Sequence, residues 1–276
     1  MKSKSETKDY WNDRGKSSFV YRNEAFYTIT PIPYYYKRRV IFLKSLKREI
    51  EMLQKTCKTV RIHDFGCGDG WYLNYFCKIF PNIEFSGFDI SESFIERAKS
   101  VLPESVSLSF GDIDTGNNAS YDMIYSSVVF AHISNDIIGD IFNNVYRMLS
   151  SGGDNSGSGI FVLFEQTSGG GSAVEGVTYI RRLSSEYEQV AKNSGFRLVE
   201  KFTVDFTVHR LFERYLAKKL YKLFKGDTQV EQRLNANSNH FFRFLSTLAC
   251  ILSINPIKRK NKNYWGNTFF IFKKNG

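Results

Sequence analysis

The stretch Ile62-His-Asp-Phe-Gly-Cys-Gly-Asp-Gly-Trp71 decides the fold of this chain. A β-rich run over residues 60–65 ends beside an acid, Asp64, and three glycines at two-residue spacing follow before a helical stretch. Glycine is needed where a tight strand-to-helix turn takes up unusual backbone angles and where a ligand approaches the main chain. The pattern is GxGxG and not the GxGxxG of a dinucleotide-binding loop. A charged Asp64 beside such a loop suits an ammonium group better than a pyrophosphate.

Outward from this loop, short β-rich runs alternate with helical patterns. Helices are predicted at residues 70–80, from an N-cap at Ser91, along the apolar face from Ile137 to Leu149, and at 184–193, ending near Gly195. Strand–helix alternation implies a mostly parallel sheet with right-handed crossovers, which is the α/β class. The predicted strands are residues 60–65, 83–88, 106–110, 123–127, 160–164, 197–204 and 267–273.

Two Ser/Gly-rich stretches and one long insertion interrupt this alternation. Residues 150–159 and 168–172 are predicted to be flexible connections, and the second is either a mobile edge of the acceptor site or a surface insertion. Residues 206–266 contain an amphipathic pattern and a strongly apolar one, and we call them the lid. The chain is therefore divided into an N-terminal helical cap (1–59), a core (60–205 plus 267–276) and the lid (206–266).

Composition and length place the chain among ordinary folded proteins. It has 276 residues, of which 42% are hydrophobic and 24% are charged. Its four cysteines show no CxxC spacing, which argues against zinc or an iron–sulfur cluster, and no metal site is expected. No apolar run approaches the roughly 20 residues of a membrane span, and the first residues form no signal region. We therefore expect a soluble protein of a reducing cytoplasm.

The net charge of +10 is unevenly distributed. Residues 1–59 carry 14 Lys/Arg against 6 Asp/Glu, residues 60–205 carry 10 against 19, and residues 206–276 carry 14 against 3. One interpretation is a background of Lys and Asn supplied by an AT-rich genome. The other is that the basic flanks face an anionic acceptor or a membrane surface.

Further motifs follow the glycine loop in a fixed order. Asp89 ends the second strand, where a carboxylate can accept two ribose hydroxyls, and Gly111-Asp112-Ile113 ends the third. The fourth strand and the turn after it lie in Tyr121-Asp-Met-Ile-Tyr-Ser-Ser-Val-Val-Phe-Ala-His-Ile133. Gly152-Gly153 precedes the fifth strand, and Ser194-Gly-Phe196 precedes the sixth.

In order and spacing, these motifs resemble the class I S-adenosylmethionine-dependent methyltransferases, over residues 60–205 and the last strand. The resemblance implies a seven-stranded, mostly parallel, doubly wound sheet, with S-adenosylmethionine as the cofactor. Two features depart from the family: residues 112–122 are short for the usual helix before strand four, and Ser/Gly/Asn residues lengthen the connection before strand five. The residues expected to bind the cofactor are Asp64, Gly66, Cys67, Gly68, Gly70, Asp89, Ile90, Asp112, Ile113, Ser126 and Ser127.

In similar small-molecule methyltransferases an N-terminal helix with aromatic residues closes over the cofactor. Tyr10, Trp11 and Tyr21 are the candidates here, and aromatic residues packed on a helix are the alternative.

Methyl transfer to a hydroxyl also needs a base that accepts the proton. His132 follows the fourth strand and is the candidate, the alternative being a residue packed within the turn. His63, in the first strand, is expected in the core, whereas His209 and His240 fall in the lid. Glu165, which ends strand five, is a candidate acid for binding the acceptor.

The lid is the one indication of the acceptor. Its aromatic and basic residues fit a phosphate-bearing sugar, because aromatic faces stack on sugars and Lys/Arg bind phosphate. We therefore expect O-methylation of a sugar, glycan or other small molecule, in bacterial surface-polysaccharide biosynthesis. The apolar residues 241–254 and Lys258-Arg-Lys260 form either a lid core or a peripheral contact with an anionic membrane.

Two other functions are alternatives. An RNA or protein methyltransferase could use the basic flanks, but the fourth strand lacks an Asn/Asp-Pro-Pro-Tyr motif and no nucleic-acid module is attached, so DNA is not an expected partner. A non-catalytic binding module is disfavoured because the residues expected to bind the cofactor are all present.

Overall fold

The computed structural model describes residues 4–16, 32–111, 120–151, 159–170, 173–175, 179–205, 257–259 and 266–275. The chain divides into two compact units. The first consists of Met1–Lys16, Leu43–Thr203 and Lys260–Gly276, and the second of Ser17–Phe42 and Val204–Arg259. The glycine loop and the motifs after it belong to the first unit.

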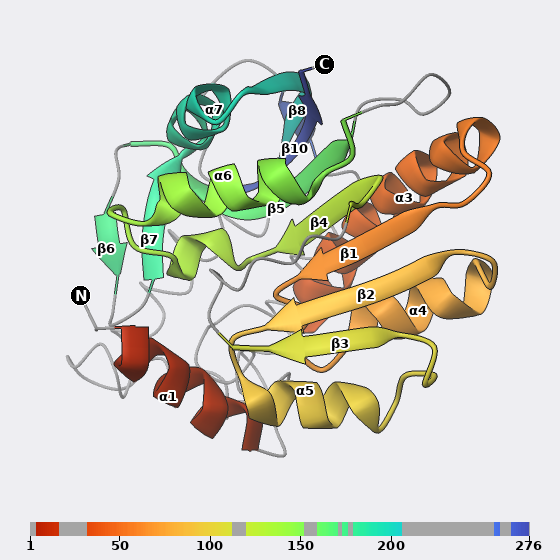
Figure 1. The fold of residues 1–276 in the computed structure, drawn as a ribbon. Coiled ribbons are helices and arrows are strands. Elements are labelled where there is room, and N and C mark those ends of the chain that lie inside the picture. Colours follow the sequence, from red (N-terminus) through yellow and green to blue (C-terminus); the bar gives the residue numbers. More distant parts are fainter. Residues whose placement is uncertain are drawn as a thin grey trace. The chain divides into compact units, whose positions relative to one another are not determined.

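The sheet of the first unit follows the order β3-β2-β1-β4-β5-β10-β8 (Figure 1). Strands β1, β2, β3, β4 and β5 pair in parallel, and β10 is antiparallel to β5. This arrangement confirms the predicted seven-stranded, mostly parallel sheet. The bounds are β1 (Arg61–Phe65), β2 (Glu84–Asp89), β3 (Ser107–Phe110), β4 (Met123–Ser127), β5 (Ile160–Ser168), β8 (Phe196–Asp205) and β10 (Gly266–Lys274).

The register places the ends of the parallel strands at one edge. Phe65 pairs with Phe88, and Ser127 pairs with Phe164, so the residues that follow β1, β2, β4 and β5 emerge together. Ligands of open α/β sheets bind at the carboxyl ends of the strands, near a point where the strand order reverses. Here the order reverses between β1 and β4. A ligand-binding site is therefore expected at this edge of the sheet, between β1 and β4.

The helices form close to where the sequence predicts them. Ser91 caps α5 as expected, because its Oγ accepts a hydrogen bond from the Phe94 N–H at 3.3 Å. Gly195 ends the turn after α7 with a φ of 90°, a left-handed conformation that favours glycine. The helices are α1 (Lys4–Lys16), α3 (Ile32–Thr56), α4 (Trp71–Ile79), α5 (Glu92–Lys99), the short 3₁₀ helix η1 (Phe130–His132), α6 (Ile138–Met148) and α7 (Ser184–Asn193).

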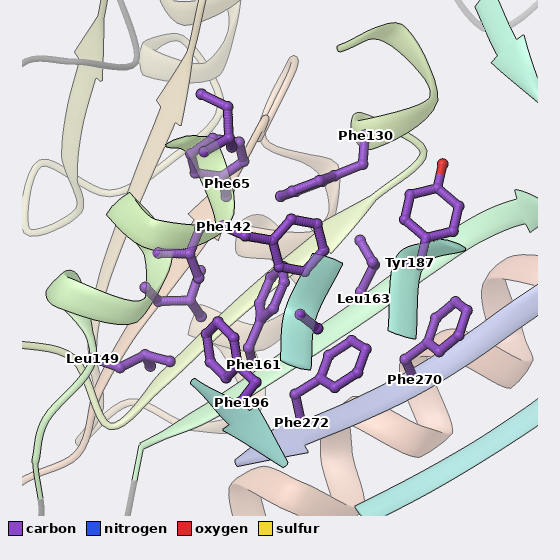
Figure 2. Packing of buried hydrophobic residues seen from close by; sticks show 14 of the residues in the cluster. Phe65, Phe130, Phe142, Leu149, Phe161, Leu163, Tyr187, Phe196, Phe270 and Phe272 are labelled. Atoms are coloured by element: carbon purple, nitrogen blue, oxygen red, sulfur yellow. The ribbon is translucent and has the colours of Figure 1, made fainter. Parts of the chain in front are cut away.

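Helices cover both faces of the sheet. On one face Ile124 of β4 belongs to a buried cluster that includes α6 and α7, with many of its aromatic rings drawn in Figure 2. The next residue, Tyr125, points to the other face, where its ring packs against Phe76 of α4 at 6.2 Å between centroids. Successive strand residues alternate between faces, so this pair shows the doubly wound arrangement.

The structure differs from the prediction after the fifth strand. Strand β5 continues to Ser168, where a flexible connection was expected to begin. A hairpin of β6 (Ala173–Glu175) and β7 (Tyr179–Leu183) follows, and β7 pairs in parallel with the end of β5. The prediction missed this hairpin because its strands have only three and five residues, too few to show a clear alternation, and follow a Ser/Gly-rich stretch.

Several predictions fall outside the described residues. They concern Tyr21, Asp112, Ile113, the segment 116–118, Gly152-Gly153, His209 and His240. Most of the lid is also outside them, although β9 (Ile257–Arg259) of the second unit is described. The division of the chain at residues 59, 205 and 266 stays a prediction. Among the helices that the structure does describe, none has the length and apolar character needed to cross a membrane.

Candidate active site

The loop between β1 and α4 is built on glycines in the left-handed conformation. Gly66, Gly68 and Gly70 have φ angles of 82°, 54° and 77°. A Cβ at Gly66 would lie 2.2 Å from Cγ2 of Val129, so that position also requires the absence of a side chain. At Gly68, a Cβ would meet nothing within 4 Å. The main chain at Gly68 is therefore open to close approach by a ligand.

Asp64 lies beneath this loop with an unsatisfied oxygen. It is 1% exposed, and its Oδ2 has no hydrogen-bond partner among the described residues. Burial raises the pKa of Asp64 well above its usual value; a hydrogen bond with Tyr125 opposes this rise, and the charge of Asp89 adds to it. A buried carboxyl oxygen without a partner is costly, and a cationic ligand would satisfy it.

Asp89, at the end of β2, connects the glycine loop to α5. Its Oδ2 accepts from the Gly68 N–H and its Oδ1 from the Ser91 N–H, both at 2.9 Å. Burial raises the pKa of Asp89 to about 6, against the two backbone hydrogen bonds, which lower it. Each carboxylate oxygen has a second lone pair, so the group can still accept from ligand hydroxyls. The neighbouring Ile90 is half-buried.

The other predicted residues of the loop and of β4 make contacts within the protein. Ser126 is fully buried, and its Oγ donates to the Phe65 carbonyl at 2.8 Å, which ties β4 to β1. Ser127 is half-buried, with its Oγ 3.5 Å from the Tyr72 hydroxyl. Cys67 is buried, and burial raises the pKa of its thiol. Their roles toward a cofactor stay predictions.

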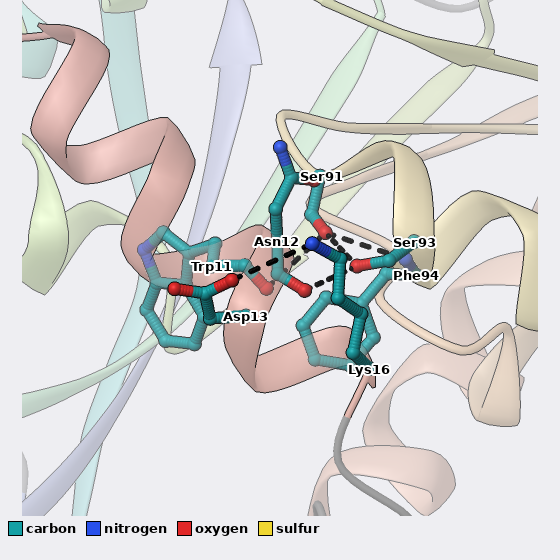
Figure 3. Close-up of polar contacts among 7 residues, drawn as sticks. All are labelled: Trp11, Asn12, Asp13, Lys16, Ser91, Ser93 and Phe94. Atoms are coloured by element: carbon teal, nitrogen blue, oxygen red, sulfur yellow. Dashed lines mark hydrogen bonds and ion pairs between the residues drawn. The ribbon is translucent and has the colours of Figure 1, made fainter.

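Helix α1 docks on the start of α5 through its main-chain carbonyl groups, and the contacts of Trp11 and Asn12 are drawn in Figure 3. Ser91 Oγ donates to the Trp11 carbonyl at 3.2 Å, and Ser93 Oγ donates to the Asn12 carbonyl at 2.7 Å. An Arg97 guanidinium N–H donates to the Gly15 carbonyl at 3.1 Å. These contacts bring a helix from the chain's beginning to the carboxyl end of β2.

Docking of α1 places Trp11 against His132. The two rings meet edge to face with centroids 4.8 Å apart. Tyr179 of β7 contacts the same imidazole, with centroids 5.4 Å apart. Tyr10 packs edge to face on Trp11 and accepts a hydrogen bond from Arg14 at 3.0 Å. The structure therefore brings the predicted Trp11 and His132 together and adds Tyr179, which the sequence did not indicate.

The sequence suggested that Glu165 binds the acceptor. In the structure its carboxylate binds the turn after β4 instead. It is fully buried, and its carboxylate accepts from the N–H groups of Val129, Phe130 and Ala131 at 2.8, 2.7 and 3.3 Å. Burial raises the pKa of Glu165 to about 7, although these bonds and the charge of Arg182 lower it.

His63 is a core residue, as expected. Its side chain is 2% exposed, its Nδ1 lies 2.8 Å from Ser86 Oγ, and its ring stacks on Tyr121. Burial lowers the pKa of His63 to about 4. The neutral imidazole therefore belongs to the packing of β1.

Comparison with known proteins gives three findings. Residues 62–153 match a family described as a methyltransferase domain. A malonyl-[acyl-carrier protein] O-methyltransferase of Ilyobacter polytropus is 34% identical over 99 residues, which are 35% of this chain and 36% of that protein. The chain thus matches only about a third of the length of this relative. The family match, over residues 62–153, includes the glycine loop and the strands β2, β3 and β4.

Solved structures share the fold at low sequence identity. An O-methyltransferase from a trans-AT polyketide synthase of Brevibacillus brevis, solved with S-adenosyl-L-homocysteine, has a TM-score of 0.53 at 18% identity, covering 79% of this chain and 67% of that one. Phosphoethanolamine N-methyltransferase 2 of Haemonchus contortus has a TM-score of 0.54 at 18% identity, covering 96% of this chain and 60% of that one.

Proposed function

The chain carries a class I S-adenosylmethionine-dependent methyltransferase domain, and from this premise we propose that it methylates an oxygen atom of a small-molecule acceptor. The observation that carries the proposal is the edge formed by Asp64, Gly68 and Asp89. Three features lie there, at the carboxyl ends of the adjacent strands β1 and β2: a buried carboxyl oxygen without a partner, an open glycine main chain and a carboxylate with free lone pairs.

These residues fit the cofactor group by group. Asp64 would meet its ammonium, Gly68 would allow its methionine part to approach the main chain, and Asp89 would accept from its ribose hydroxyls. The predicted adenine contacts of Asp112 and Ile113 lie outside the described residues. When bound, S-adenosylmethionine supplies a methyl group already activated by its sulfonium charge.

The protein's contribution is then to align the acceptor and to remove a proton. Positioning an oxygen in line with the methyl group lowers the barrier by making the encounter effectively unimolecular. In the proposed reaction the His132 imidazole would accept the proton that the acceptor hydroxyl loses, and would later release it to solvent. Trp11 and Tyr179 both contact the imidazole through their rings, which restricts its orientation.

We favour the hydroxyl of a sugar or glycan, in a phosphate-bearing molecule, as the acceptor. The support is sequence-based: the lid combines aromatic residues with a strong excess of Lys and Arg. The second candidate is the free carboxylate of an acyl thioester, because a relative is named for malonyl-[acyl-carrier protein]. That match covers 35% of this chain and 36% of that protein, so we rank this acceptor second.

The two acceptors differ in whether their methylation needs a catalytic base. A carboxylate is already ionised near neutral pH and has no proton to lose, whereas a hydroxyl does. The experiment is methyl transfer from labelled S-adenosylmethionine to fractionated cell extract, with mass spectrometry of the labelled product. The product identifies the acceptor, and the same assay is repeated with His132→Ala.

For a hydroxyl acceptor, His132→Ala should lower kcat by about 10²–10⁴ and leave the affinity for S-adenosylhomocysteine within about threefold. For a carboxylate acceptor, kcat should change little. If cofactor affinity and melting temperature fall together, His132 is a packing residue and the base lies elsewhere.

A further inference from the structure

The turn after β4 contains a strained residue. Val128 has a φ of 58°, and no other non-glycine residue in the described part of the chain has a positive φ. A β-branched side chain in the left-handed region is a genuine outlier. Such a conformation persists only where the surroundings hold it, and it occurs often at functional sites. Here the strain lies four residues before His132, the proposed base.

The Glu165 carboxylate accepts hydrogen bonds from the main-chain N–H groups of this turn. Its Oε1 accepts from Val129 and Phe130, and its Oε2 accepts from Ala131. One buried carboxylate therefore satisfies three consecutive main-chain donors directly after the strained residue. Charge-assisted bonds of this kind are stronger than neutral ones. The carboxylate fixes where η1 begins.

The Arg182 guanidinium donates hydrogen bonds to the main-chain carbonyl groups of the same turn. Its Nη1 donates to the Phe130 carbonyl at 2.7 Å, and its Nη2 donates to the Ile133 carbonyl at 2.5 Å. The guanidinium also donates to the Asn135 Oδ1, at 3.0 Å from Nε and 2.7 Å from Nη2. A planar group with five donors can bind several acceptors at once, which a lysine cannot do.

Both residues reach the turn from outside it and are themselves buried, at 0% exposure for Glu165 and 2% for Arg182. Arg182 comes from β7, the hairpin strand that also supplies Tyr179 to the His132 ring. The hairpin that follows β5 thus contributes two contacts to one turn. We propose that Glu165 and Arg182 are positioning residues for methyl transfer, which clamp residues 128–135 so that His132 faces the acceptor. This inference rests on the proposed function.

The main test compares Arg182→Met with Arg48→Met. Arg48 serves as the control because its guanidinium is also hydrogen-bonded, to the carboxylates of Glu49 and Glu200, but it lies on α3 and not on the β6–β7 hairpin. Arg182→Met should speed amide exchange of Val129, Phe130 and Ala131 at least about tenfold, shift the His132 imidazole NMR signals, and lower kcat about 30-fold. Affinity for S-adenosylhomocysteine should stay within about threefold of the wild-type value.

Two milder variants keep the test decisive if Arg182→Met folds poorly. Arg182→Lys keeps the charge but not the fork, so it should recover folding and not the wild-type kcat. Glu165→Gln keeps the shape of the side chain and should loosen the same amides, whereas Glu49→Gln, which alters another buried carboxylate, should not.

The proposal is overturned if these variants leave the amides of the turn and the His132 signals as in the wild type, or change them no more than the controls do. It is also overturned if Arg182→Lys has full activity. Failure of the proposed function would be seen separately, as wild-type protein that binds no S-adenosylhomocysteine.

Discussion

Four buried ionisable groups show how single residues divide between stability and function. Asp64 and Asp89 have raised pKa values because burial disfavours their charged forms. Both lie where hydrogen bonds or an ion pair with a ligand would stabilise those charged forms. Glu165 is buried to hold a turn. His63 is buried without a ligand role, and because its pKa is lowered, it reduces the stability of the fold at acid pH.

The pH dependence of stability should therefore include a measurable contribution from His63. Its pKa falls from an ordinary 6.5 to about 4 on folding, so between these values the unfolded chain binds more protons. Stability that is present above pH 6.5 is lost as the pH falls toward 4. Relative to His63→Phe, which keeps a ring against Tyr121, the wild type should lose about 2 kcal/mol between pH 7 and pH 5.

Urea unfolding at the two pH values measures this difference. Asp89 and Glu165 have raised pKa values, so their contributions have the opposite sign and are lost as the pH rises. Both proteins contain these carboxyls, and the comparison cancels them. Equal losses in wild type and His63→Phe would show that the imidazole does not titrate with a lowered pKa.

Among the elements, α1 approaches α5 closely at Gly15. A Cβ at Gly15 would lie 2.2 Å from Ser93 Oγ and 3.1 Å from the Phe94 nitrogen. Gly15→Ala should therefore displace α1 from α5, at a cost of about 1–3 kcal/mol. Faster tryptic cleavage at Arg14 and Lys16 and weaker binding of S-adenosylhomocysteine should follow, because Trp11 moves with the helix.

Gly139→Ala is the matched control for this change. Gly139 is also helical, in α6, but a Cβ there meets nothing within 4 Å. Alanine favours helices over glycine, so this variant should be neutral or more stable by up to about 1 kcal/mol. Identical proteolysis of the two variants would argue against α1 docking at Gly15.

Some of the elements could be predicted from the sequence and others could not. The strands and helices around the glycine loop follow from hydrophobic periodicity and from capping residues such as Ser91, which are local signals. The β6–β7 hairpin and the clamp on the turn do not. Arg182 and Glu165 act on main-chain groups of residues far away in the sequence, and no local pattern encodes that pairing. Val128 likewise gives no sign of its strained φ.

Over the whole molecule, the uneven charge makes a prediction about the lid, which lies mostly outside the described residues. Changing Lys218, Lys219 and Lys222 to Gln should raise KM for a phosphate-bearing acceptor and weaken its salt dependence, with cofactor binding intact. The control changes three exposed lysines of the first unit, Lys47, Lys78 and Lys99. An unchanged KM with lost pelleting on anionic vesicles would assign the lid lysines to membrane attachment instead.

The central claim, that the edge around Asp64, Gly68 and Asp89 binds S-adenosylmethionine, is tested most directly by calorimetric titration with S-adenosylhomocysteine. We expect micromolar binding by the wild type, and about 10- to 100-fold weaker binding by Asp89→Asn, which loses a charge-assisted acceptor. Asp122→Asn, at the amino end of β4, removes a carboxylate that accepts from the Arg61 N–H and should bind as the wild type does. No binding of S-adenosylhomocysteine by the wild type, or tight binding of NADH in its place, would contradict the claim.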